Sequence, residues 1–134
     1  MGNPILKISL PGVFSGQELT QKDIYEIVSS PLSNWRSDGS LTYVDEAEGT
    51  EIRLVIVPCS DSRFVLKYDL IANGNDRCYF SLGASDKLNQ YFEHDDDEYM
   101  IEGFLIDGSH AEYALLDFVQ SKGCLLYTSD AADD

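Results

Sequence analysis

The sequence predicts an α+β fold, an antiparallel β-meander sheet with an N-terminal and a C-terminal helix packed on one face. Two observations predict it. Apolar and polar residues alternate in successive segments between about residues 40 and 82, and this two-residue period is typical of half-buried strands. On either side of these segments, apolar residues recur at intervals of three and four, which is the period of an amphipathic helix.

The first helix is expected at about residues 21–29. Thr20 can cap its N-terminus, with Asp23 three residues later as the acidic partner of a capping box. Pro31 forbids continuation of the helix. The stripe expected to face the sheet consists of Ile24, Ile27 and Val28.

Four strands are expected next, at about residues 40–45, 51–58, 63–71 and 77–82. A two-residue turn at Asn73-Gly74 would place Leu70 opposite Arg77, which conflicts with the alternation of the last strand, because a slip of one residue turns every side chain over. We therefore predict a three-residue loop at 73–75 that pairs Leu70 with Cys78 and makes Cys78 a core residue. The same reasoning predicts an odd-length loop at 58–62.

The C-terminal part contains the best helical pattern of the chain. We expect a capping box formed by Ser109 and Glu112, and a left-handed Gly123 at the end of the helix. A short strand is expected at about 102–106, and the segment before it is either a helical turn or a loop packed on the sheet. The buried stripe of the last helix is expected to contain Ala111, Ala114, Leu115, Phe118 and Val119.

The length of 134 residues favours one domain, expected at residues 1–123. The last eleven letters, CLLYTSDAADD at 124–134, match the translation of a sequencing adapter in one frame. We therefore expect 124–134 to be a non-native tail and exclude it from reasoning about the fold.

The charge balance is strongly acidic, with 24 Asp and Glu against 9 Lys and Arg, a formal net charge of -15. Such a surface repels nucleic acid and anionic lipid, and it attracts a basic partner. No apolar run is long enough to cross a membrane, and the N-terminus lacks the pattern of a secretion signal. Three cysteines without paired spacing favour reduced thiols. We expect a cytoplasmic protein with no nucleic-acid or membrane partner.

The segment from His94 to Glu98, HDDDE, has the composition of a metal or acid–base site. Its acids are consecutive and lack a central glycine, so it does not match a calcium-binding loop. We interpret it as a solvated acidic loop. No catalytic residue, metal or cofactor is assigned, and an enzyme is the minority hypothesis. A metal-dependent or hydrolytic site at His94–Glu98 remains the alternative.

Clustered acids are the candidate binding residues, because acidic and aromatic side chains together suit a protein-binding surface. Trp35, the only tryptophan, is either an interface anchor or a lid over the sheet. The first acidic cluster brackets a turn and contains Asp45, Glu46 and Glu48, and the second contains Glu93, Asp95, Asp96, Asp97 and Glu98.

The order of elements resembles the immunity proteins of bacterial polymorphic toxin systems, in particular the family numbered first among them. The resemblance lies in the strand LKYDL, the segment YFSLG and the final helix HAEYALLDFVQSKG. In that helix the family's small and aromatic positions are matched by Ala111, Ala114, Phe118 and Gly123, with one extra residue before the glycine. It covers roughly residues 20–123.

The resemblance implies a small cytoplasmic protein that binds and neutralises a cognate toxin domain, often a nucleic-acid deaminase or nuclease. Such an enzyme carries a basic cleft, which an acidic protein can plug. The toxin-contacting residues do not transfer from the family, so the acidic clusters are inferred from charge alone. An acidic adaptor domain of unrelated lineage is a further alternative.

Overall fold

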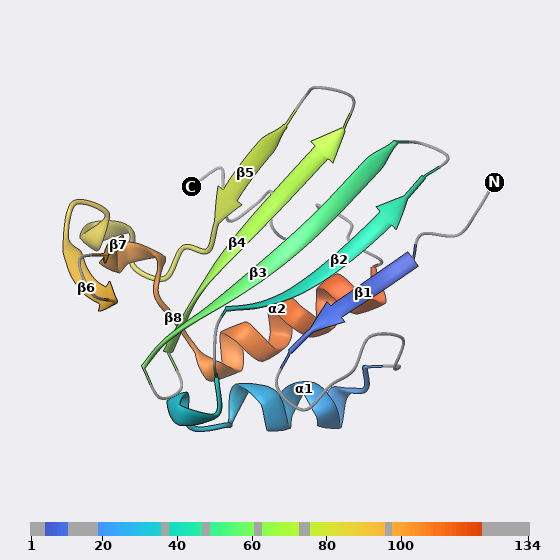
Figure 1. Cartoon of the computed structure of the whole chain (residues 1–134). Helices are drawn as coiled ribbons and strands as arrows, with labels where there is room; N and C mark the ends of the chain where they lie inside the picture. The colour runs from blue at the N-terminus through green and yellow to red at the C-terminus, as the bar shows by residue number, and fades with distance from the viewer. Residues whose placement is uncertain are drawn as a thin grey trace.

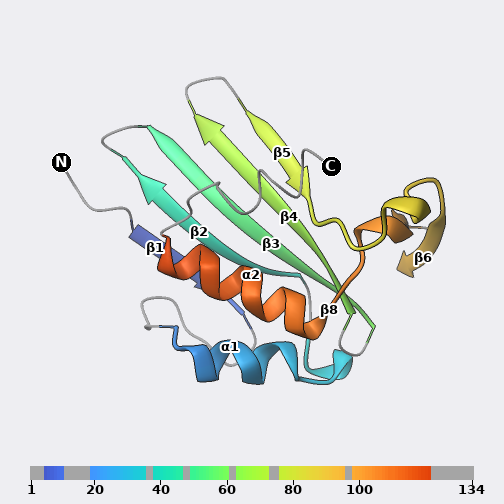
Figure 2. The ribbon, with the colours of Figure 1, turned by 180° about the vertical axis from the view of Figure 1, so that it is seen from behind.

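Six strands form one antiparallel sheet, five of them in the order β1-β2-β3-β4-β5, and both α-helices cover the same face of it (Figures 1 and 2). The α+β prediction is therefore confirmed. The computed structural model describes residues 5–10, 19–35, 38–46, 49–60, 63–72, 76–95 and 98–121. These five strands are β1 (Ile5–Ser9), β2 (Gly39–Asp45), β3 (Thr50–Ser60), β4 (Arg63–Ala72) and β5 (Arg77–Phe80), and the helices are α1 (Gln21–Val28) and α2 (Gly108–Gln120).

The remaining elements connect the sheet to α2. A short strand, β8 (Ile106–Asp107), pairs with the start of β4 beyond the end of β5. Before it, β6 (Tyr91–Asp95) and β7 (Glu98–Ile101) form a separate two-stranded hairpin. Three short 3-10 helices complete the described chain: η1 (Leu32–Asn34), η2 (Ser85–Lys87) and η3 (Glu102–Phe104). The expected strand at 102–106 is thus wrong, because residues 102–104 are η3 and only Ile106 and Asp107 pair with the sheet.

The core is built from a row of apolar side chains that crosses the whole sheet. Direct strand partners in this row are Ile8, Leu41, Leu54, Tyr68 and Tyr79. Helix α2 packs on the row with the expected stripe, of which Ala111, Leu115 and Phe118 are buried and Ala114 and Val119 are partly buried. The stripe of α1 is fully buried beside it, as its spacing predicts.

The register between β4 and β5 differs from the prediction. Leu70 lies opposite Arg77 and Asp69 lies opposite Cys78, which is the pairing of the shorter turn. Cys78 is therefore exposed, and Tyr79 packs against the core next to Tyr68. The apolar area of a tyrosine ring exceeds that of a thiol, so burying Tyr79 outweighs burying Cys78. The expected loop at 58–62 is wrong, because β3 continues to Ser60 and β4 begins at Arg63. An irregularity between Pro58 and Ser60 nevertheless gives the facing that this loop was predicted to produce, with Ile56 opposite Leu66.

The two helix starts show how local chemistry decides a cap. The capping box of Thr20 and Asp23 forms as predicted, with both hydrogen bonds present. The cap of α2 was expected at Ser109 but is Asp107, whose carboxylate accepts a hydrogen bond from the backbone N–H of His110 at 2.9 Å. Ser109 instead donates its hydroxyl proton to that carboxylate. The expected left-handed Gly123 and the tail at 124–134 lie outside the described residues.

Candidate functional site

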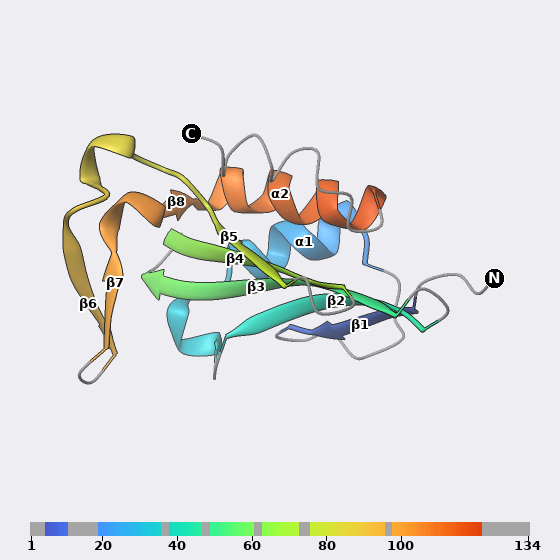
Figure 3. The same ribbon diagram turned by 90° about the horizontal axis from the view of Figure 1, so that it is seen from above.

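The β6–β7 hairpin stands apart from the main sheet and carries the second acidic cluster. Seen from above, it crosses the end of the sheet and reaches past it on the side away from the helices (Figure 3). Its register pairs Tyr91 with Ile101, Phe92 with Met100 and Glu93 with Tyr99. Sequence reasoning expected a helical turn or a loop here, because the polarity of the segment does not alternate.

One face of this hairpin presents Tyr91, Glu93 and Tyr99, because residues two apart on a strand share a face and Tyr99 lies directly opposite Glu93. Both tyrosine side chains are 66% exposed. Phe92 and Met100 lie on the other face and are half-buried. The aromatic residues of the hairpin therefore do not belong to the hydrophobic core of the domain.

The hairpin is held by a neck formed by η2 and η3. The backbone N–H of Glu102 donates to the carbonyl oxygen of Gln90 at 2.8 Å, and the N–H groups of Gly83 and Ala84 both donate to the carbonyl oxygen of Gly103. Gly103 is buried, and a Cβ atom there would lie 2.7 Å from the carbonyl oxygen of Ala84. This close approach explains why the position is a glycine.

Two further contacts fix the neck to the sheet. Phe80 of β5 stacks on Phe104 with ring centroids 4.7 Å apart. The hydroxyl of Ser81 donates to the carbonyl oxygen of Phe104 at 2.6 Å and accepts from the backbone N–H of Leu66 at 3.0 Å. The base of the hairpin is thereby tied to β4 through specific contacts.

The second acidic cluster falls on this hairpin. Asp95 pairs with Glu98 at the end of the ladder, after a register shift. Asp96 and Asp97 lie outside the described residues, and the described side chains do not include those of His94, Asp95 and Glu98. Glu93 is exposed. Among the described residues, no group of three or more His, Cys, Asp or Glu side chains could hold a metal ion.

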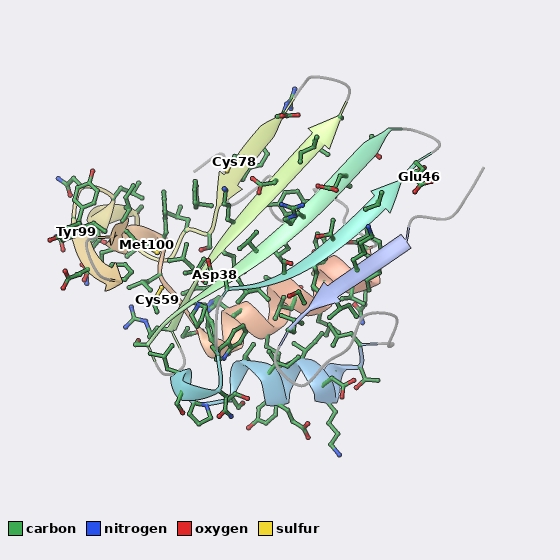
Figure 4. The ribbon with its side chains drawn as sticks, in the orientation of Figure 1. Asp38, Glu46, Cys59, Cys78, Tyr99 and Met100 are labelled. Atoms are coloured by element: carbon green, nitrogen blue, oxygen red, sulfur yellow. The ribbon has the colours of Figure 1, made fainter. Side chains whose placement is uncertain are left out.

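The first acidic cluster lies at the other end of the molecule. Asp45 and Glu46 come at the turn from β2 to β3, where Gly49 adopts a left-handed φ of 67° that favours glycine. Figure 4 shows Glu46 at the opposite side of the molecule from Tyr99 of the hairpin. Glu48 lies outside the described residues. The structure therefore does not bring the two acidic clusters together.

Trp35 lies in the core and is only 8% exposed. Its ring packs edge-on against Phe64 of β4 with centroids 5.8 Å apart. Of the two placements considered for Trp35, the structure shows the one over the sheet. Its indole edge contributes little to the described surface.

A groove of about 370 Å³ lies where the start of β4, the neck and the N-terminus of α2 meet, and sequence reasoning missed it. Arg63, Lys87 and His110 contribute its basic side chains. Lys87 lies 4.0 Å from Glu102, and the His110 Nδ1 atom lies 2.7 Å from the Asp107 carboxylate. Lys87 and His110 therefore each lie beside an acidic side chain. No spacing in the sequence marks this groove, because its residues come from five separate elements (β4, η2, η3, β8 and α2) and the segments between them.

The two described thiols, Cys59 and Cys78, are not activated as nucleophiles. Burial raises the pKa of the Cys59 thiol to about 11, and burial also raises the pKa of Cys78. Both thiols therefore stay protonated at neutral pH. Hydrogen bonds from the backbone and side chain of His110 lower the pKa of Asp107 to about 2, so this carboxylate is ionised at neutral pH.

No α-helix within the described ranges is both long and apolar enough to cross a bilayer. A comparison of the chain with known protein families, with curated proteins and with solved structures finds no match.

Proposed function

We propose that this protein acts in the cytoplasm as an immunity protein, which binds and neutralises a cognate toxin domain through an acidic surface. The observation that carries the proposal is the β6–β7 hairpin. It projects from the domain and displays two exposed tyrosines beside the exposed Glu93, and these tyrosines do not belong to the core cluster. The acidic run follows Glu93 in the sequence. Exposed aromatic residues with charged neighbours are typical of protein-binding surfaces.

The charge of the chain supports a basic partner. The formal net charge is -15, and it is still -12 without the three aspartates of 124–134 (-15 + 3). Such a charge attracts a positively charged protein over long range and accelerates their encounter, and it disfavours nucleic acid. An enzyme that handles nucleic acid has a basic cleft, so an acidic hairpin can occupy that cleft in place of the substrate. The long-range part of this attraction weakens as salt rises.

The proposal predicts that the adjacent upstream gene encodes a toxin domain, and co-expression with that domain tests it. We expect the toxin domain to stop growth of a bacterial host, and this protein to restore growth and to co-purify with the toxin. A host that dies equally with and without the protein would refute the proposed function.

Charge reversal then locates the contact. Changing Asp95, Asp96 and Asp97 to lysine should abolish protection. The matched control changes Asp45, Glu46 and Glu48 to lysine. This variant changes the net charge by the same amount in the other acidic cluster, and it should still protect the host against the toxin domain. Equal protection by both variants would show that the acidic run of the hairpin does not contact the toxin domain.

The second candidate is a metal-dependent or hydrolytic enzyme. The His94–Glu98 segment motivates it by composition, and the contact between His110 and Asp107 in the groove gives it a geometric basis, because a carboxylate can orient an imidazole as a general base. Calorimetric titration with zinc, calcium and manganese tests the metal-dependent form. Heat of binding with any of them would support this candidate over a pure binding protein.

A further inference from the structure

The exposed face of the β6–β7 hairpin combines one carboxylate with two aromatic rings and with the half-buried Ile101, which lies opposite Tyr91. Glu93 lies directly opposite Tyr99 and two residues after Tyr91. Directly opposite residues of an antiparallel pair have Cβ atoms about 5 Å apart, and residues two apart on one strand are separated by about 7 Å. The carboxylate is therefore flanked by a tyrosine on each strand.

The spacing of the two tyrosines suits a flat cation. Tyr91 and Tyr99 are diagonal neighbours across the hairpin, and such positions lie about 7–8 Å apart. A planar group placed between them would lie about 4 Å from each ring, within the range of about 6 Å over which a cation is attracted to an aromatic face. The carboxylate of Glu93 then provides two oxygen atoms for hydrogen bonds in the same place.

We propose that this face binds arginine side chains on the surface of a basic protein partner. The guanidinium group is planar, stacks on aromatic rings and pairs with a carboxylate through two parallel hydrogen bonds. A lysine ammonium has the same charge, but it is not planar and cannot donate two parallel hydrogen bonds to one carboxylate. It therefore gains less binding energy between two aromatic rings. The overall negative charge of the chain favours such a partner and disfavours an anionic one.

The neck makes the hairpin an ordered platform for this contact. Gly103 packs against the backbone of η2, and Phe104 stacks on Phe80 of the sheet. Tyrosine itself has only two rotatable side-chain angles, so little conformational freedom is lost when its ring is fixed. A preformed platform of this kind reduces the entropic cost of binding.

The inference names the contact used in the proposed function, and its test is designed to be separable from that function. The full chain is titrated in about 0.15 M salt with two peptide probes of equal length and charge, one of alternating arginine and glycine and one of alternating lysine and glycine. Binding is followed by amide NMR shifts. We expect the arginine peptide to bind about fivefold more tightly and to shift the amides of β6 and β7 most.

Three variants make the test specific. Changing Tyr91 and Tyr99 together to alanine should bring the two peptides to nearly equal affinity, and Glu93→Gln should weaken both about threefold. The matched control is Tyr25→Ala, which removes a comparably exposed tyrosine from α1 and should leave the preference intact. A dispersed NMR spectrum of each variant confirms that it is folded.

The outcomes separate the two proposals. An arginine preference that survives the loss of both tyrosines, or shifts confined to the β2–β3 turn, would overturn the inference. Full neutralisation of the toxin domain by the double tyrosine variant would also overturn it, while leaving the proposed function in place. The opposite result is also informative. If the protein prefers the arginine peptide through Tyr91 and Tyr99 but does not neutralise the toxin, the arginine-binding inference stands and the proposed immunity function is refuted.

Discussion

The main sheet and the β6–β7 hairpin are both antiparallel, yet they use their tyrosines in opposite ways. Tyr68 of the sheet is 1% exposed and packs edge-on against Phe118 of α2 with centroids 5.9 Å apart. Tyr91 and Tyr99 of the hairpin are each 66% exposed. Burial of aromatic area stabilises the first region, and the second region leaves comparable area available to a partner. The difference separates the tyrosines that stabilise the fold from the tyrosines that are available to contact a binding partner.

The largest expected effect tests this division directly. Phe118→Ala should lower the free energy of unfolding by about 3–5 kcal/mol, because it removes a buried ring that contacts both Tyr43 and Tyr68. Tyr99→Ala, the matched control on the hairpin, should change it by less than about 0.5 kcal/mol. Urea unfolding followed by circular dichroism measures both. Equal losses would show that the hairpin is part of the core.

An intermediate effect is expected at the neck. In Gly103→Ala the new methyl group would meet the carbonyl oxygen of Ala84 at 2.7 Å and a methyl of Leu88 at 2.9 Å, so the neck must shift at a cost of about 1–3 kcal/mol. Hydrogen exchange should show faster exchange in β6 and β7 with unchanged protection in β3 and β4. Ser85→Ala, at an exposed position of η2, is the control and should leave both unchanged.

The smallest effect concerns the start of α2, where the neck joins the core. Asp107→Ala should cost about 1 kcal/mol, the usual cost of losing a helix N-cap. Because folding lowers the pKa of Asp107 from 3.8 to about 2, the ionised carboxylate stabilises the protein above about pH 4, and this contribution is lost as the pH falls toward 2.

Asp107→Asn isolates the titration, since asparagine keeps the capping oxygen but carries no charge. The stability difference between the native chain and this variant should shrink as the pH falls from 4 to 2. Urea midpoints measured across this range provide the check. A difference that does not change with pH would show that the charge of Asp107 is unimportant.

Local patterns predicted the fold well where one segment decides its own structure. The capping box at Thr20 and the buried stripe of α2 depend on residues three and four apart, and both are confirmed. The β4–β5 register depends on which of Cys78 and Tyr79 packs against a helix that is distant in sequence, and here the alternation alone misled. The sheet position of a side chain is a tertiary property, so periodicity cannot decide between two adjacent apolar residues.

The candidate site was only partly predictable for a similar reason. The acidic run at residues 93–98 is visible in the sequence, but the hairpin that presents it is not, since its strands lack an alternating pattern. The prediction placed Tyr91 in a segment packed on the sheet and did not single out Tyr99, because an aromatic residue is usually interpreted as core, whereas both are exposed. Their placement on each side of an acidic run was a usable signal, because two short strands joined by a polar turn bring such residues to one face.

The packing of α1 against α2 has a consequence for synthesis of the protein. These two helices come from opposite ends of the described chain and contact each other over the same sheet (Figure 2). The part of the core row that α2 covers therefore stays exposed until Phe118 has emerged from the ribosome, at a synthesis rate of about 5–20 residues per second. During that interval the part of the apolar face that lies under α2 is exposed, so we expect folding of the domain to depend on α2.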